Sequence, residues 1–278
     1  MNIDASVRNA LDKNLNVYFI ATADKDMNVD KRTVVPANPG CDCYSVAKAY
    51  TALGVGICYD RGLLSPDTKA VDVLGKHITY DVDIKWRDVT VDHLLRHRSG
   101  VKNCLLDIDA LDASEFDTSD YLKIIFSQKL EETPGEYFRY TDDVFYLLSR
   151  IVAEVSGQNL IDLLRKPLME TMRFKEFAWS VCPQGYALGG TGLYLRTEDM
   201  VKLGVLYLCG GDWNGVRVVS EDWVNKSVER CYGFDSNENG LMVKGGMRGQ
   251  MLGIDFNSGV AFAYNGYGSY KLKDVIVD

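Results

Sequence analysis

The fold of this chain is decided by the sequence SVAKAYTALGVGICYDRGLL at residues 45–64. Most of it is apolar on every side of a helix, and a helix of that kind is buried. The run stops at the polar residues 60–62. At its start, Ser45 and Lys48 are three residues apart, so their side chains lie on the same helix face. We therefore expect a buried helix that carries a serine and a lysine side by side at its N-terminal end.

This serine and lysine pair is a candidate for nucleophilic catalysis. Amides at a helix N-terminus favour a developing oxyanion and disfavour a nearby ammonium, so burial is expected to lower the pKa of Lys48 toward that of a usable base. The spacing alone is a weak signal, because Ser99-Gly100-Val101-Lys102 is a second copy. Ser99 precedes a glycine in a turn-like stretch, whereas Ser45 opens an apolar helix. A simple helix N-cap is the alternative role for Ser45.

Composition bounds the class of protein. The 278 residues include 31 Lys and Arg against 39 Asp and Glu, which gives a net charge of −8, and 46% of them are hydrophobic. Such a chain is too apolar for disorder, and it has no run of about 18 uncharged apolar residues to span a membrane. The acidic balance, without a basic cluster, argues against a nucleic-acid partner. We expect one globular protein of one or two domains.

The N-terminal residues and the cysteines bear on location. Residues 1–15 include four charges and no apolar signal core, which predicts a cytoplasmic location for the chain as given, or a secreted one if a leader was trimmed. The seven cysteines have no framework spacing, which favours reduced thiols over disulfides.

Cofactor and metal patterns are incomplete. Cys41-Asp42-Cys43 has no second Cys or His pair at ligand spacing, and His93 and His97 lack the glutamate of a zincin helix. We expect no metal and take both histidines as structural. No Walker loop, no Gly-x-Gly-x-x-Gly after a strand and no Gly-x-Ser-x-Gly elbow is present. No organic cofactor is expected.

The order of predicted elements suggests how the chain is organised. A helix and a strand open it, helices dominate the middle, and a hairpin closes it, which favours an antiparallel sheet built from both ends with a helical insertion. For the helix expected over 86–97, Thr90 is a plausible N-cap, followed by an apolar face at Val91, Leu94 and Leu95. The expected helices are 1–15, 45–58, 86–97, 142–155, 161–169 and 197–209, and the expected strands are 16–22, 193–195, 250–256 and 260–265.

Four segments together resemble the serine beta-lactamase and penicillin-binding-protein superfamily, in its class C-related, esterase-like branch. They occur in the order of the family and cover nearly the whole chain. The stretch VTVDHLLRHRSGV resembles the family's T-x-x-H-L-L-x-H-x-S-G segment, and TPGEYFRYTD resembles its P-G-x-x-x-x-Y-S-N stretch. The four segments are 45–64, 89–101, 133–142 and 189–200.

The resemblance implies a fold and two domains. It predicts an α/β (α+β) chain of the beta-lactamase/transpeptidase-like fold, with an antiparallel sheet flanked by helices and an additional all-helical domain. We expect the sheet domain to comprise residues 1–64 and 189–278 and the helical domain residues 65–188, with Ser45 in the cleft between them.

The resemblance also implies roles for three residues. Ser45 would be the acylated nucleophile, Lys48 its base or proton relay, and Tyr140 the phenol that passes a proton to the leaving group. Backbone amides of Ser45 and of a residue on a strand of the last domain would form the oxyanion hole. Tyr140 has a simpler alternative, which is packing beside Phe138 and Phe145.

Two departures from the family pattern affect the site. Asp142 stands where the family has an asparagine, which places an acceptor-only carboxylate near Lys48 and is expected to raise the lysine pKa. The third motif is irregular and has two possible registers. In the favoured one, the stretch GMRGQ puts Met247 in the place of the family's His or Lys, Gln250 at the oxyanion amide after Gly249, and Arg248 as a replacement positive charge.

The second register sets Lys244-Gly245-Gly246 in the place of the family's Lys-Thr-Gly. With either register, the resemblance implies a serine hydrolase that cleaves an ester, amide or peptide acyl bond through a Ser45 acyl-enzyme. Small esters are the first expectation for the substrate, D-alanyl peptides the second and β-lactams the last. The alternative is a catalytically impaired penicillin-recognising or ligand-binding protein of the same fold, suggested by Asp142 and Met247.

Overall fold

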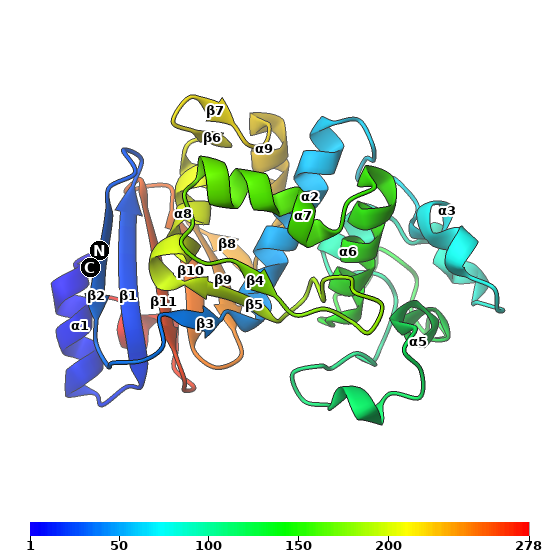
Figure 1. Cartoon of the computed structure of the whole chain (residues 1–278), viewed down its shortest axis with the longest axis horizontal. Coiled ribbons are helices and arrows are strands. Elements are labelled where there is room, and N and C mark those ends of the chain that lie inside the picture. Colours follow the sequence, from blue (N-terminus) through cyan, green and yellow to red (C-terminus); the bar gives the residue numbers. More distant parts are fainter. Residues whose placement is uncertain (278) are drawn as a thin grey trace. The chain divides into compact units, whose positions relative to one another are not determined.

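The computed structural model describes residues 1–277, which form two compact units (Figure 1). The first unit comprises Met1–Ala49, Arg165–Ala178 and the chain from Leu193 onward, and the second comprises Tyr50–Leu164 and Trp179–Gly192. These units differ from the predicted domains at three segments, 50–64, 165–178 and 189–192. The predicted domain limits stay a prediction.

A six-stranded antiparallel sheet forms the centre of the first unit, in the order β2-β1-β11-β10-β9-β8 (Figure 1). Strands from the two ends of the chain are neighbours, since β1 pairs with β11 along its length. This confirms the antiparallel sheet expected from the sequence. The strands are β1 (Val17–Asp24), β2 (Val29–Thr33), β8 (Ser236–Glu238), β9 (Leu241–Gly246), β10 (Gln250–Asp255) and β11 (Val260–Gly266).

Helices of the first unit pack on both faces of this sheet. On one face, α1 (Ile3–Asp12) and α10 (Leu272–Val275) share an apolar core with β1 and β11. On the other face, α8 (Thr197–Leu208) crosses close to the strands, because an added Cβ on Gly204 would lie 2.6 Å from Cβ of Ala261. Glycine is therefore the residue that lets α8 approach the sheet.

The second unit is mainly helical, and its longest helix is buried. Within α6 (Asp143–Ser156) every residue from Asp143 to Val152 is buried, and Gly157 ends the helix in the left-handed conformation. The helix predicted over 86–97 is wrong as a single element. It consists of a 3-10 turn, Ile84–Asp88, and α4 (Val91–Leu95), which are separated because Thr90 adopts an extended conformation and caps α4.

Other elements agree with the sequence in place, with small differences in length. The helix predicted to begin near residue 45 starts as a 3-10 turn, Tyr44–Val46, and continues as α2 (Ala47–Asp60). The helix predicted over 161–169 becomes α7 (Leu160–Arg165) followed by one π-helical turn, Lys166–Thr171. The remaining elements are β3 (Gly40–Asp42), β4 (Ala178–Trp179), β5 (Leu193–Arg196), β6 (Asp212–Trp213), β7 (Val216–Arg217), α3 (Ala70–Leu74), α5 (Tyr121–Phe126) and α9 (Glu221–Arg230), with 3-10 turns Gly75–His77 and Ala113–Glu115.

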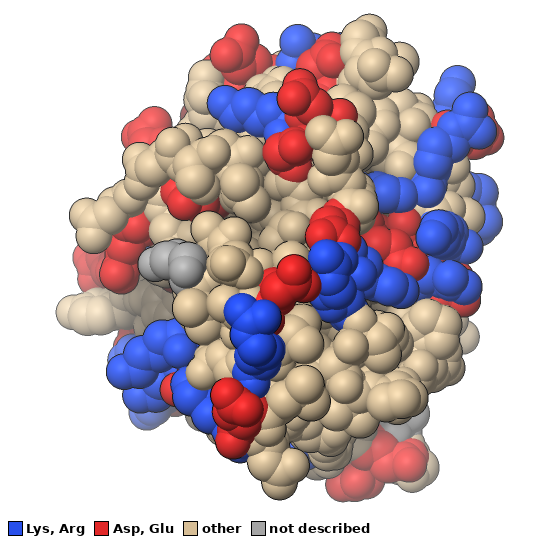
Figure 2. Space-filling model, turned by 90° about the vertical axis from the view of Figure 1, so that its left-hand side faces the viewer, with Lys and Arg blue, Asp and Glu red and all other residues tan. Residues whose placement is uncertain are grey.

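The surface on the side of α1, β1 and β2 has mixed charge. Figure 2 shows Lys and Arg side chains close to Asp and Glu side chains in several groups on this face, with uncharged residues between the groups. A mixed surface gives a polyanion no extended basic area to bind. Within residues 1–277, no helix combines the length and the apolar character that crossing a bilayer requires.

Candidate active site

The turn that carries Ser45 is fixed from the strand before it. β3 pairs with β5, and the Cys43 amide continues this pairing by donating to the Leu193 carbonyl at 2.7 Å. Tyr44 then adopts φ 44°, a left-handed conformation that is uncommon for a residue other than glycine. The Asp42 carboxylate stabilises it by accepting a bond from the Tyr44 amide at 2.8 Å. Backbone strain of this kind concentrates at functional sites.

Ser45 and Lys48 meet as the sequence predicts. Ser45 lies in the 3-10 turn and Lys48 in the first turn of α2, where the Lys48 Nζ is 3.0 Å from the Ser45 Oγ. The Lys48 side chain is fully buried. A buried amine at hydrogen-bond distance from a hydroxyl is placed to take its proton.

The second Ser-x-x-Lys has a different geometry. The Ser99 hydroxyl accepts a bond from the Val101 amide at 3.4 Å, and the Lys102 Nζ is 2.7 Å from the exposed Glu131 carboxylate. Here the serine closes a turn and the lysine forms a surface ion pair. The same spacing thus produces a side-chain pair only where it falls on a helix.

The two registers of the third motif fall on different kinds of structure. Lys244 lies on β9 and its side chain is 2% exposed, with Nζ 2.5 Å from an oxygen of Asp235. β9 runs past the turn that carries Ser45, because an added Cβ on Gly246 would lie 2.8 Å from the Cys43 carbonyl oxygen. The segment Lys244-Gly245-Gly246 therefore borders that turn.

The GMRGQ stretch contains the hairpin loop, residues 247–249, that joins β9 to β10. Gly246 pairs with Gln250 across the strands, and Gly249 has φ 84°, as a three-residue hairpin loop requires. Met247 is 49% exposed. The Gln250 side chain closes the loop, donating to the carbonyls of Arg248 at 3.3 Å and Gly266 at 2.9 Å.

Arg248 contacts the residues that follow β11, because its carbonyl accepts a bond from the Gly268 amide at 3.0 Å. Its guanidinium is 5.4 Å from the centre of the Tyr267 ring, a cation–π distance. Tyr267, Tyr44 and Gln250 line a cavity of about 290 Å³ that also includes Asp42. One of its lining residues, Tyr44, is the residue that directly precedes Ser45.

The remaining predicted residues belong to the second unit. Tyr140 is 43% exposed and its ring stacks on His97, with centroids 4.4 Å apart. The ring is therefore held by packing, while His97 accepts a bond from the Thr141 amide at 3.4 Å. Asp142 precedes α6, and its carboxylate borders Gly190, where an added Cβ would lie 2.9 Å from the Asp142 Oδ1.

Asp143 is a buried carboxylate that the sequence did not single out. It accepts bonds from the amides of Leu105 at 3.1 Å and Leu106 at 2.8 Å and from the Gln128 side chain at 2.7 Å. Burial raises the pKa of Asp143 in spite of these bonds. Asp143 therefore holds the backbone at residues 105–106, a few residues after the 99–101 turn. No local pattern distinguishes it from the other acids of the chain, so only the structure reveals it.

The histidines hold loops together. The His93 amide donates to the Thr90 hydroxyl at 3.2 Å, and the His93 ring accepts a bond from the Thr90 amide at 3.4 Å, which closes a capping box on α4. Burial lowers the pKa of His93. Over residues 1–277, no three His, Cys, Asp or Glu side chains gather as a metal site would require.

A family model supplies the decisive comparison. The model described as Beta-lactamase matches residues 13–271, nearly the whole chain. The chain belongs to the Beta-lactamase family.

Within this family, individual relatives are distant. The chain is 32% identical over 126 residues to penicillin-binding protein 4 of Amycolatopsis lactamdurans, a match over 45% of this chain and 32% of that protein. It spans about a third of the length of the curated relatives it matches, and 31% in the case of Protein flp of Staphylococcus aureus.

Solved structures of similar fold cover most of the chain. A putative 6-aminohexanoate-dimer hydrolase from Bacillus anthracis matches with a TM-score of 0.80 at 14% identity, over 95% of this chain and 77% of that one. A family VIII carboxylesterase matches with a TM-score of 0.74 at 15% identity, over 99% of this chain and 92% of that one. At these identities the similarity establishes the beta-lactamase fold, as the sequence predicted.

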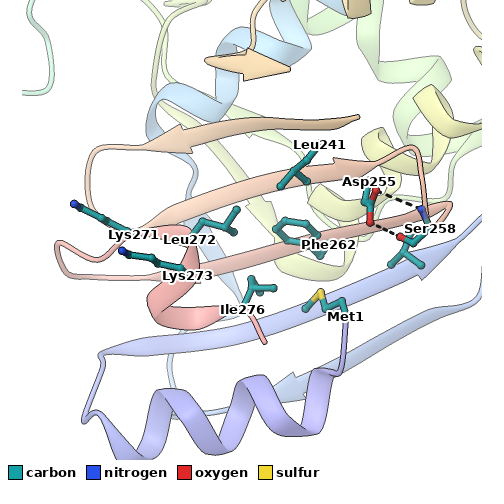
Figure 3. A pocket seen from close by; sticks show the side chains of 10 residues that line it. Met1, Leu241, Asp255, Ser258, Phe262, Lys271, Leu272, Lys273 and Ile276 are labelled. Carbon is teal, nitrogen blue, oxygen red and sulfur yellow. Dashed lines mark hydrogen bonds between the residues drawn. The ribbon is translucent and has the colours of Figure 1, made fainter. Parts of the chain in front are cut away.

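A second cavity of this beta-lactamase-family chain lies on the sheet face near the termini. Figure 3 shows the apolar side chains of Met1, Phe262 and Ile276 around it, while Lys271 and Lys273 extend away. Its volume is about 430 Å³. None of the predicted site residues lines it.

The cysteines of the beta-lactamase-family chain are expected to react slowly. All seven have free thiols, and burial raises the pKa of Cys58 and of Cys104 to about 12. Because thiolates and not thiols are alkylated, iodoacetamide at neutral pH should modify these two cysteines about 10²-fold faster in denaturant than in the native protein. Peptide mass spectrometry measures both rates. Fast modification of native Cys58 would contradict the buried environment.

Proposed function

We propose that this protein is a serine hydrolase that transfers the acyl group of an ester or amide through a covalent intermediate on Ser45. The observation that carries the proposal is the 3.0 Å separation of the buried Lys48 Nζ from the Ser45 Oγ. The pair lies after a strained residue and at the start of a helix, where amides favour a developing negative charge.

The proposed reaction has two steps. In the first, the Ser45 oxygen attacks the substrate carbonyl carbon while Lys48 accepts the hydroxyl proton. The bond from that carbon to the leaving oxygen or nitrogen then breaks, and Tyr140 passes a proton to the leaving group. In the second step, water attacks the carbonyl carbon of the acyl-enzyme and gives one proton to the Tyr140 oxygen that was deprotonated in the first step. The bond from that carbon to the Ser45 oxygen breaks, Lys48 returns its proton to Ser45, and the acid is released.

For the third motif, we propose the register Lys244-Gly245-Gly246. The Gly245 amide donates to Asp235, away from β10. In an antiparallel strand, the backbone amides of successive residues point to opposite sides, so the Gly246 amide points toward β10. Gly246 and Gln250 therefore form a hydrogen-bonded pair, and the Gln250 amide is used in pairing β10 with β9. The next amide that faces outward is that of Met247. We propose it, with the Ser45 amide, as the oxyanion hole.

The proposed substrate class is a small ester or amide. Support comes from the family VIII carboxylesterase and the putative 6-aminohexanoate-dimer hydrolase that share the fold. The cavity of about 290 Å³ beside Tyr44 has room for a short acyl chain or a small leaving group. Asp142 remains the departure that is expected to slow Lys48.

Hydrolysis of a chromogenic ester tests the proposal. The wild-type protein should hydrolyse p-nitrophenyl butyrate, and Ser45→Ala should lose about 10³-fold or more of kcat/KM, because it removes the hydroxyl that the buried Lys48 amine contacts. Release of p-nitrophenol is the readout, and thermal unfolding checks that the variant is folded. Equal rates for the two proteins would refute the role of Ser45. Binding of the ester without turnover would favour the catalytically impaired alternative.

A further inference from the structure

The strand next to Ser45 has an edge that β8 leaves open. β8 pairs with β9 from Glu238↔Leu241 to Ser236↔Val243, and no β8 residue stands opposite Lys244 to Gly246. An open strand edge presents N–H and C=O groups to which an extended ligand can pair. At this place the edge lies beside the Ser45 turn, since Gly246 borders the Cys43 carbonyl.

A carboxylate of the chain itself occupies part of this edge. The Asp235 amide donates to the Val243 carbonyl at 2.9 Å, which extends the ladder by one residue. One Asp235 oxygen accepts the Gly245 amide at 2.8 Å, and the other is 2.5 Å from the Lys244 Nζ. The Asp235 carboxylate thus accepts from both a backbone amide and an ammonium group, the two donors that a bound anion would use.

The charges of this pair are unequally exposed. The Lys244 side chain is 2% exposed, whereas Asp235 is 43% exposed. An approaching ligand therefore meets the negative member of the pair first. The buried cation is also neutralised by its partner, so it offers little attraction to a second anion.

The backbone before Asp235 is close to the catalytic helix. An added Cβ on Gly233 would lie 2.6 Å from the Lys48 carbonyl oxygen and 3.0 Å from Cα of Ala49. Gly233 and Gly246 thus contact the chain on either side of Ser45, and Asp235 and Lys244 lie within two residues of these contacts. Asp235 therefore follows, by two residues, a glycine that contacts the helix of Lys48, and its carboxylate binds the two residues before Gly246.

We propose that Asp235 is a specificity-determining residue, which excludes acyl donors that carry a carboxylate and selects neutral ones. It does so by filling the anion-binding position on β9 with its own carboxylate and by repelling a second negative charge there. This inference rests on the proposed function, since it names the substrate class of the Ser45 site. An anionic substrate has to displace Asp235 from Lys244 and Gly245 before it can bind there.

Two esters of matched leaving group test the inference. p-Nitrophenyl butyrate is a neutral donor, and p-nitrophenyl hemiglutarate carries a carboxylate at the end of its acyl chain. The variants are Asp235→Asn, which keeps the shape and an acceptor oxygen, and Asp235→Ala, which opens the edge. Asp222→Asn is the control, because it removes one negative charge from an exposed ion pair with Lys226 on α9.

The measured quantity is the ratio of kcat/KM for the anionic ester to that for the neutral ester. We expect this ratio to rise about 10-fold or more in both Asp235 variants and to stay at the wild-type value in Asp222→Asn. Because both esters are measured on the same preparation, partial unfolding cancels in the ratio.

Two different results would overturn the inference, and they are distinguishable. If the wild-type protein hydrolyses the neutral ester but the ratio is unchanged in the Asp235 variants, Asp235 does not select substrates although Ser45 acts as proposed. If the wild-type protein hydrolyses neither ester faster than Ser45→Ala does, the proposed function fails and this inference fails with it.

Discussion

Replacement of Lys48 by methionine is expected to reduce the rate at which a fluorophosphonate phosphonylates Ser45 about 10³-fold or more, although the protein stays folded. Methionine resembles lysine in length and suits a fully buried position, but it cannot accept the proton of the Ser45 hydroxyl, which is 3.0 Å from Nζ in the structure. The rate is measured as the time course of modification by a fluorophosphonate, with thermal unfolding as the check on the fold.

Lys102→Met is the matched control for this variant. Lys102 belongs to the second Ser-x-x-Lys, where it forms an exposed ion pair with Glu131. Exposed pairs contribute about 1 kcal/mol or less to stability, so this variant should keep the wild-type rate of phosphonylation. A similar loss in both variants, or none in Lys48→Met, would show that Lys48 is not the base.

Gly233→Ala is expected to destabilise the fold by about 3 kcal/mol and to lower activity with it. Gly233 has φ 76°, and a Cβ there would lie 2.6 Å from the Lys48 carbonyl oxygen, a backbone atom that cannot turn away. The chain must therefore shift at the helix that carries Lys48. Urea unfolding followed by circular dichroism gives the change in the free energy of unfolding.

Gly215→Ala separates the steric effect from the backbone conformation. Gly215 also has a left-handed φ, 81°, but no atom lies within 4 Å of the position of its added Cβ. This variant should cost about 1–2 kcal/mol and leave activity intact. Equal losses for the two variants would mean that Gly233 matters for its conformation alone and not for its approach to Lys48.

The parts of the site that follow from local sequence were the predictable ones. Ser45 and Lys48 are one helical turn apart on an apolar helix, so their proximity depends only on helix geometry. Thr90 as an N-cap and the hairpin of β10 and β11 are local in the same sense. The fold itself was predicted from four ordered segments, and the family model and the sheet order confirm it.

The third motif shows where sequence reasoning reaches its limit. Glycines at 245, 246 and 249 suit either register, because each can end a strand or form a turn. Only the pairing of Gly246 with Gln250 identifies the residues between them as a loop. The same pairing makes the register of Lys244, which the sequence placed second, the better proposal.

Asp143 and Asp235 were missed for a related reason. Asp143 accepts bonds from a loop almost 40 residues earlier, and Asp235 meets Lys244 from across a turn. Both depend on contacts between segments that no local period encodes. The helix predicted over 86–97 was correct in its cap and wrong in its start, because Thr90 caps α4 and the residues before it form a separate 3-10 turn.

The most direct test of the central claim is the intact mass of the protein after incubation with a fluorophosphonate. We expect the addition of one phosphonyl group, located at Ser45 by peptide mapping and absent from Ser45→Ala. An unmodified wild-type protein, or an adduct that persists in Ser45→Ala, would contradict the claim that Ser45 is the activated nucleophile.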